Sequence, residues 1–269
     1  MGLFCLKISP EQGYKMSLIG KMTVAAIPLA TVMTTTPVAA AEEVQDMSDP
    51  LAVYTQAGTG ITNDGLNLKF GNTYDTGNPD TMAMNIIEIK GFGGDTLGLD
   101  GNDSINSARF RNFSLDTTNG RGAQIDASWD FNNNTGSMSY SFIQALPAIG
   151  SVQFYPLAGV GLTLTDSAEI RGQEHEIGSV GYAIPSSFMM LGTYSKVTLT
   201  DNIWLNYNPM YINTFNNNDY MSDRMDGIHH EIAASYQLNP RQNVRLFGNY
   251  ADTELNDDWD WRVEFNQQF

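Results

Sequence analysis

Apolar and polar residues alternate along most of this chain, in segments that polar turns separate. The clearest segment is AQIDASWDF (123–131), where alanine, isoleucine, tryptophan and phenylalanine take the odd positions and polar residues the even ones. SMSYSF (137–142) and VQFYPLAGVGLTL (152–164) show the same period, and no helical periodicity of useful length follows residue 42. A period of two residues predicts β-strands with one apolar and one polar face, so we expect an all-β fold.

Twelve segments of this kind fit between residue 42 and the C-terminus, which is an even number. We predict strands at 50–58, 65–75, 81–91, 105–116, 121–131, 137–146, 151–164, 187–199, 203–214, 228–238, 243–251 and 259–269. One alternative stays open, because EHEIGSVGYA (174–183) also reads as a strand. Either 50–58 or 174–184 then supplies the twelfth strand. We favour 50–58, since the other choice puts a long connection among the short turns.

The apolar faces need either a protein core or lipid. Strands of about 9–11 residues, tilted, are the length that crosses a bilayer, whereas strands of soluble sheets average about five or six. Aromatic residues gather towards the predicted strand ends, as interfacial girdles require. The pattern favours a transmembrane antiparallel up-and-down β-barrel, which must close because an open edge in lipid leaves backbone groups unpaired. A soluble β-sandwich is the alternative fold.

The N-terminal region has the features of a secretory signal peptide. Lysines at 15 and 21 precede the apolar run MTVAAIPLATVM (22–33), and the small residues Ala39 and Ala41 fit cleavage after Ala41. Met16 is an alternative start. We therefore expect a signal peptide region at 1–41 and a single barrel domain at 42–269. The only cysteine, Cys5, falls in the first part, so the exported chain would have no thiol.

The chain ends on WDWRVEFNQQF, with Trp261, Val263, Phe265 and Phe269 on one parity. With the export signal and the strand pattern, this ending resembles the Gram-negative outer-membrane β-barrel proteins. In that class the last strand carries alternate aromatics and a terminal phenylalanine that the barrel-assembly machinery reads. The resemblance implies an assembly signal at these four residues, although Gln267 departs from the apolar expectation. It implies a place in the bacterial outer membrane and identifies no subfamily.

Composition excludes one class of partner. The formal net charge is −16 at pH 7, and a nucleic-acid backbone needs a basic surface. We expect no nucleic acid, no cofactor and no protein-held metal site. The partners implied by the resemblance are outer-membrane lipid, lipopolysaccharide and the assembly machinery. The acidic outer loops, including Asp95, Asp100 and Asp103 in GFGGDTLGLDGNDS (91–104), allow weak binding of divalent cations shared with lipopolysaccharide.

With the C-terminus in the periplasm, short turns lie inside and long loops outside, at 59–64, 92–104, 132–136, 165–186, 215–227 and 252–258. Strand parity then directs charged side chains into the lumen: Lys69, Glu88, Lys90, Arg109, Arg111, Asp126, Asp130, Lys196, Glu231, Arg245, Asp260, Arg262 and Glu264. Their balance of signs predicts little ion selectivity in the lumen itself. The acidic loops predict a modest cation preference at low salt.

A twelve-stranded barrel lies between side-chain-filled eight-stranded forms and open sixteen-stranded porins. We predict a narrow porin-like passive channel for small polar solutes. A structural or surface-interaction barrel and a lipid-modifying enzyme are the alternatives. Enzymatic catalysis would depend on the three histidines. His229 shares lumenal parity with Glu231, whereas His230 lies on the opposite face of the strand. His175 lies in the longest loop. No recognisable motif surrounds them, so we expect no enzymatic activity.

Overall fold

The computed structural model describes residues 44–166, 182–215, 219–251, 253 and 259–269. The chain divides into two units, 1–41 and 42–269, and every described residue belongs to the second. The predicted signal peptide therefore lies outside the described residues. Among those residues, no helix has the length and apolar character needed to span a bilayer.

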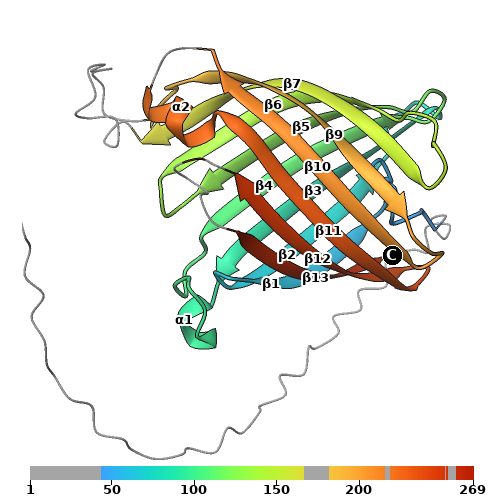
Figure 1. Cartoon of the computed structure of the whole chain (residues 1–269), viewed down its shortest axis with the longest axis horizontal. Helices are drawn as coiled ribbons and strands as arrows, with labels where there is room; N and C mark the ends of the chain where they lie inside the picture. The colour runs from blue at the N-terminus through green and yellow to red at the C-terminus, as the bar shows by residue number, and fades with distance from the viewer. Residues whose placement is uncertain (1–43, 167–181, 216–218, 252, 254–258) are drawn as a thin grey trace, which may run out of the picture. The chain divides into compact units, whose positions relative to one another are not determined.

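Twelve antiparallel strands form a closed barrel (Figure 1). The strands are β1 (Gln56–Thr62), β2 (Leu66–Tyr74), β3 (Thr81–Phe92), β4 (Ser107–Asp116), β5 (Arg121–Asp130), β6 (Thr135–Gln144), β7 (Val152–Asp166), β9 (Ser187–Thr198), β10 (Ile203–Thr214), β11 (Gly227–Asn239), β12 (Gln242–Ala251) and β13 (Asp260–Gln268). Each pairs with the next along the chain, and β13 closes the ring on β1, with Gln56 opposite Gln268. The predicted fold class is confirmed.

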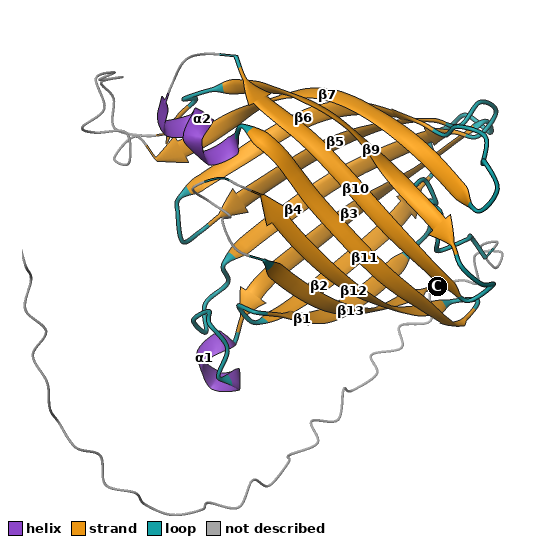
Figure 2. Ribbon diagram, viewed as in Figure 1, coloured by secondary structure: helices purple, strands orange, loops and turns teal. Residues whose placement is uncertain are grey.

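The two ends of the barrel differ in their connections (Figure 2). At one end, the loop end, lie the short helices α1 (Gly94–Leu97) and α2 (Asp219–Met225) and the two-residue strand β8 (Tyr182–Ala183). At the other, the turn end, tight connections such as 240–241 join the strands. The C-terminus lies at the turn end, where the Phe269 backbone N–H donates to the Thr55 carbonyl oxygen at 3.0 Å.

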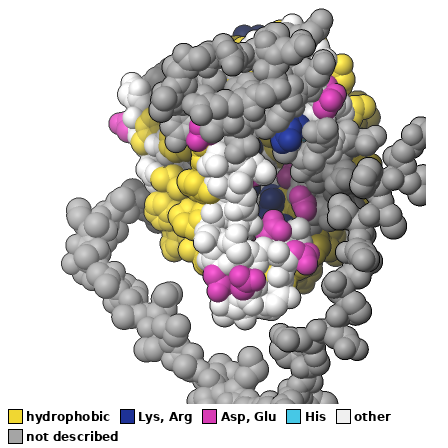
Figure 3. All heavy atoms as spheres, turned by 90° about the vertical axis from the view of Figure 1, so that its left-hand side faces the viewer, with side chains coloured by type: hydrophobic (Ala, Val, Ile, Leu, Met, Phe, Trp, Pro, Cys, Tyr) yellow, Lys and Arg dark blue, Asp and Glu magenta, His cyan; other side chains and the backbone are white. Residues whose placement is uncertain are grey.

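The outer surface of the barrel is apolar. Large hydrophobic side chains from many strands point outward, among them Phe70 (55% exposed), Phe142 (62%) and Val160 (56%). Figure 3, a view onto the loop end, shows hydrophobic side chains at the sides of the barrel and acidic side chains on the end that faces the viewer. Keeping so much apolar area in water would cost roughly 25 cal/mol per Å², whereas lipid removes that cost. The outer face is therefore suited to a bilayer.

Eleven predicted strands agree with the observed ones to within two residues at each end, but the first was wrong. We expected 50–58, and the strand is Gln56–Thr62. Alternation is weak there because the lumenal positions of β1 include Gly58 and Gly60. A Cβ on Gly60 would lie 2.5 Å from the Val263 carbonyl oxygen, so glycine lets β1 pack closely between its neighbours.

The open alternative for the twelfth strand is settled by barrel closure. Residues 174–181 of the competing segment lie outside the described residues. Its last two described residues form β8, which pairs only with the end of β7, Ala183 opposite Thr165. Because β1 pairs with both β2 and β13, the ring is complete without β8.

Deleting Phe269 should lower the amount of barrel in the outer membrane severalfold and leave protein in the periplasm. The reason is the terminal aromatic pattern that the sequence shares with outer-membrane barrels; Phe269 itself is 56% exposed and so adds little to the core. The measurement is heat-modifiable gel mobility of membrane fractions. Phe131→Gln, which removes an exposed aromatic at the loop end, is the matched control. Unchanged outer-membrane levels after deletion would contradict the assembly-signal prediction.

Candidate functional site

A cavity of about 540 Å³ lies inside the barrel. All twelve barrel strands line it with inward side chains, because every second residue of a barrel strand faces the lumen. Ten of the predicted lumenal charges line it: Lys69, Glu88, Lys90, Arg109, Arg111, Asp126, Glu231, Arg245, Arg262 and Glu264.

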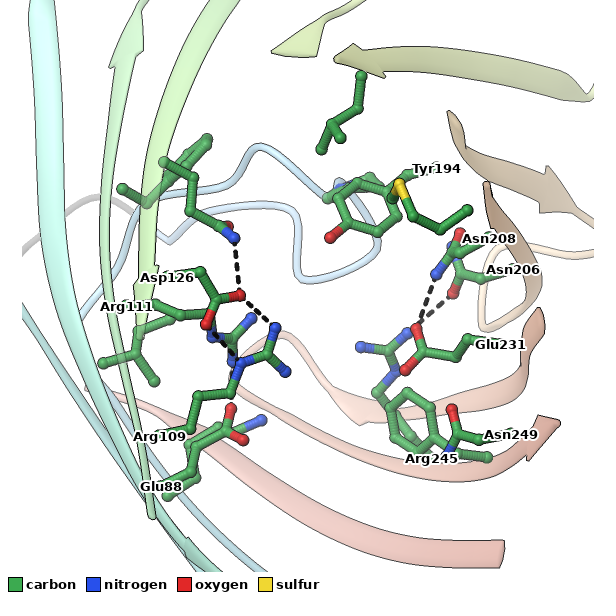
Figure 4. A pocket seen from close by; sticks show the side chains of 18 of the residues that line it. Glu88, Arg109, Arg111, Asp126, Tyr194, Asn206, Asn208, Glu231, Arg245 and Asn249 are labelled. Carbon is green, nitrogen blue, oxygen red and sulfur yellow. Dashed lines mark hydrogen bonds and ion pairs between the residues drawn. The ribbon is translucent and has the colours of Figure 1, made fainter. Parts of the chain in front are cut away.

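One wall of the cavity carries a charge network on β3, β4 and β5, shown on the left of Figure 4. Arg109 Nε donates to Asp126 Oδ1 at 2.8 Å, and a second Arg109 nitrogen contacts the other carboxylate oxygen, so the pair is bidentate. Glu88 lies between two cations: Lys90 Nζ is 2.9 Å away, and Arg111 pairs with its other oxygen. Glu88 is only 7% exposed, so these partners compensate a buried charge.

The opposite wall, on β10, β11 and β12, combines one guanidinium with amides (Figure 4). Arg245 donates to Ser235 Oγ at 3.0 Å and to Asn206 Oδ1 at 2.9 Å. Asn208 Nδ2 donates to Glu231 Oε1 at 2.8 Å. This wall therefore offers neutral hydrogen-bonding groups beside its charges.

A third group of contacts joins the two walls across β1. Lys69 Nζ on β2 lies 3.2 Å from Glu264 Oε2 on β13, and Arg262 Nε lies 2.7 Å from Glu264 Oε1. The glycines of β1 leave room for this bridge, since Lys69 Cε lies 3.0 Å from where a Cβ on Gly58 would be. Arg262 and Arg245 both stack on Phe247, with Cζ 4.0 Å and 4.6 Å from the ring centroid.

The charges around the cavity are close to balanced. Six cations and five carboxylates line it: Lys69, Lys90, Arg109, Arg111, Arg245 and Arg262, against Asp49, Glu88, Asp126, Glu231 and Glu264. The lumen therefore has a far smaller net charge than the chain as a whole, at −16. Weak ion selectivity inside the barrel stays a prediction.

Three predicted lumenal residues do not line the cavity, because they lie near strand ends. Asp130 accepts the backbone N–H of Asn132 at 2.8 Å and so shapes the turn after β5. Asp260 accepts from Asn63 Nδ2 at 3.1 Å, at the loop end. Lys196 pairs with Asp46, 3.2 Å away, which belongs to the segment before β1.

Sequence reasoning missed the neutral and apolar lining. Asn206, Asn208 and Asn249 line the cavity beside Arg245, and Met84, Ile86 and several other apolar side chains line another part. The segment TMAMNIIEIK of β3 could have indicated the apolar lining. It is apolar on both parities, so its lumenal face cannot be purely polar. The asparagines carried no signal beyond their lumenal parity.

The histidines face different surroundings. His229 Nε2 lies 2.8 Å from the carbonyl oxygen of Met225 in α2. His230 points outward, where Nδ1 lies 2.9 Å from the Tyr207 hydroxyl and the ring stacks with Tyr207 and Tyr250. His175 is outside the described residues. Both described histidines border the cavity, but their rings make separate contacts and do not contact each other.

Several loop carboxylates hold the loops together. Asp103 accepts the Thr96 backbone N–H at 2.8 Å and its hydroxyl at 2.9 Å, and Asp226 accepts the Thr214 backbone N–H at 2.7 Å. Within the described part of the chain, no three His, Cys, Asp or Glu side chains gather as a metal ion would need. Divalent-cation binding at the outer loops stays a prediction.

A closed twelve-stranded barrel with an apolar exterior and a charged lumen is the architecture of outer-membrane channel barrels. No protein-family model and no curated protein matches the chain. Among solved structures, an outer-membrane channel from Pseudomonas putida F1 is similar at 7% identity and a TM-score of 0.54, over 84% of this chain and 98% of that one. The NanC porin is similar at 9% identity and a TM-score of 0.50, over 80% and 100%. At these identities the likeness establishes the fold.

Proposed function

We propose that this protein is a narrow passive channel of the bacterial outer membrane for small polar solutes. The signal peptide would direct export and would be cleaved after Ala41. Lipid and lipopolysaccharide would surround the barrel, and the assembly machinery would insert it through the C-terminal signal. We assign it no enzymatic activity and no cofactor.

The observation that carries the proposal is the charged lining of the cavity. Taking a charged group out of water costs several kcal/mol or more, and pairing repays that cost only with good geometry. A barrel that served only as a surface scaffold would fill its lumen at lower cost with apolar side chains. Eleven charged side chains around a cavity of about 540 Å³ are instead suited to water and a polar solute.

The test is single-channel conductance of refolded protein, residues 42–269, in planar bilayers. The proposal expects stable conductance steps and passage of small neutral solutes in liposome swelling. A barrel that is folded by heat-modifiable mobility but conducts neither ions nor solutes would contradict it. The surface-interaction alternative would then gain support.

Ion preference gives a further prediction. The exposed Asp95 and Asp100 lie at the loop end, and their carboxylates should enrich cations at the mouth, with screening over about 8–10 Å at physiological salt. Reversal potentials should show a modest cation preference at low salt that fades as salt rises. Asp95→Asn with Asp100→Asn should weaken it. A reversal potential that is independent of salt and of these changes would contradict the electrostatic effect of the loops.

A further inference from the structure

The segment before β1, residues 44–55, enters the lumen at the turn end. Leu51 and Val53 are 2% and 1% exposed, and Met47 is 6% exposed. Two backbone hydrogen bonds fold the chain on itself here, from Asp49 N to Asp46 O at 3.0 Å and from Ala52 N to Asp49 O at 3.1 Å. Figure 4 shows the blue trace crossing the inside of the barrel behind the labelled side chains. We call residues 44–55 the lumen segment.

The lumen segment rests on an apolar part of the barrel wall. Leu51 and Val53 form one buried cluster with side chains of β3, β4, β6 and β7: Met84, Ile86, Phe113, Ile143, Tyr155 and Leu157. Apolar side chains that face an aqueous lumen would be exposed to water without this cover, and burying each is favourable. We call these side chains of β3, β4, β6 and β7 the apolar seat of the lumen segment. The segment and the seat shield each other from water.

Polar contacts hold both ends of the lumen segment. Lys196 Nζ on β9 lies 3.2 Å from Asp46 Oδ2 and donates to Ser48 Oγ at 2.9 Å. At the other end, the hydroxyls of Thr55 and Thr73 are 3.0 Å apart. Burial would raise the pKa of Asp46, but hydrogen bonds from Ser48 and the nearby Lys196 outweigh it and lower the pKa. Asp46 is therefore ionised at neutral pH, as the ion pair requires.

The lumen segment also forms one boundary of the cavity. Met47, Ser48, Asp49, Pro50, Ala52 and Tyr54 all line the same cavity as the charged walls. After cleavage at the predicted site, only two residues would precede the segment, and the chain would join it to the barrel at Thr55 alone. No strand pairing depends on it, since β1 begins at Gln56.

We propose that the lumen segment is the constriction that limits passage at the turn end of the lumen, and that its apolar seat and Lys196 hold it in place. This inference rests on the proposed channel function. It locates the element that determines which solutes pass, and it assigns Leu51, Val53 and Lys196 to holding that element.

The first test replaces Leu51 and Val53 together by glutamate. Charged side chains are not accommodated in an apolar seat without partners, so the segment should leave and conductance should rise by roughly twofold or more. The solute size limit in liposome swelling should rise with it. Val44→Glu is the matched control, because Val44 belongs to the same segment but is 41% exposed. Equal conductance of the double variant and wild type, both folded, would overturn the inference.

The second test reverses the ion pair. Lys196→Glu places a second carboxylate beside Asp46. The two should repel each other, so conductance should rise as in the first test. Adding Asp46→Lys restores an opposite-sign pair and should return conductance towards the wild-type value. If adding Asp46→Lys does not lower the conductance of Lys196→Glu, the ion pair with Lys196 does not hold the segment in place.

A labelling test separates this inference from the channel function itself. The chain after residue 41 has no cysteine, so Leu51→Cys and Val44→Cys each introduce a single thiol. In refolded protein, a membrane-impermeant maleimide should label Leu51→Cys much more slowly than Val44→Cys, and Lys196→Glu should remove most of that difference. Equal rates without Lys196→Glu would show that the segment is not seated. If labelling is as expected but no variant conducts, the proposed channel fails while the seated segment stands.

Discussion

Arginine in place of Ala127 will destabilise the barrel by about 2–4 kcal/mol, whereas arginine at the adjacent Ser128 will be tolerated at a cost of about 1 kcal/mol or less. Ala127 lies on the outer face of β5 between two outward side chains, opposite Phe110 on β4 and Met138 on β6. Those neighbours are 41% and 46% exposed, which marks a surface for lipid. A guanidinium there would lose its hydration within hydrocarbon.

Ser128 is the matched control because it is one residue away and faces the lumen. Its hydroxyl lies 3.1 Å from that of Ser137 on β6. Arginine at Ser128 would extend towards the cavity and narrow it, so its conductance should fall while its stability changes little. The measurement is urea titration of folding and unfolding in lipid vesicles, followed by gel mobility. Similar losses at both positions would mean that the two faces are wrongly assigned.

Replacing Glu88 by glutamine will cost about 3–5 kcal/mol, because it leaves buried cations without their carboxylate. Glu88 is 7% exposed and is shared by Lys90 and Arg111. Glutamine keeps the size of the side chain, removes its charge and replaces one acceptor oxygen with an NH2 donor. The lining would then carry six cations against four carboxylates, so reversal potentials should also shift towards anions.

Two further variants check the cause of that loss. Adding Arg111→Gln removes one uncompensated cation and should recover part of the stability. Asp80→Asn, at an exposed position in the turn after β2, should change stability by less than about 0.5 kcal/mol. If Glu88→Gln costs no more than Asp80→Asn, the network does not stabilise the barrel. If the double variant is less stable than Glu88→Gln alone, the loss is not due to unpaired charge.

The sequence by itself determined the strands and their two faces. Side chains alternate across a strand, so a period of two residues assigns each to lipid or lumen without knowledge of the neighbours. This is why eleven strands were placed to within two residues, and why Arg109, Asp126 and Glu264 were correctly directed inward. Asp130, Lys196 and Asp260 were also predicted to face the lumen but do not line the cavity, because parity gives the direction of a side chain and not its height along the barrel.

Only the tertiary structure decided the partners in the lumen and the place of residues 44–55. Lys69 meets Glu264, 195 positions away, because β13 closes the ring on β1, and no local pattern specifies that contact. Leu51 and Val53 alternate like strand residues, yet their partners come from β3, β4, β6 and β7. In sequence, an apolar residue shows only that it avoids water. Whether lipid or an apolar patch inside the lumen covers it depends on strands that meet only when the barrel closes.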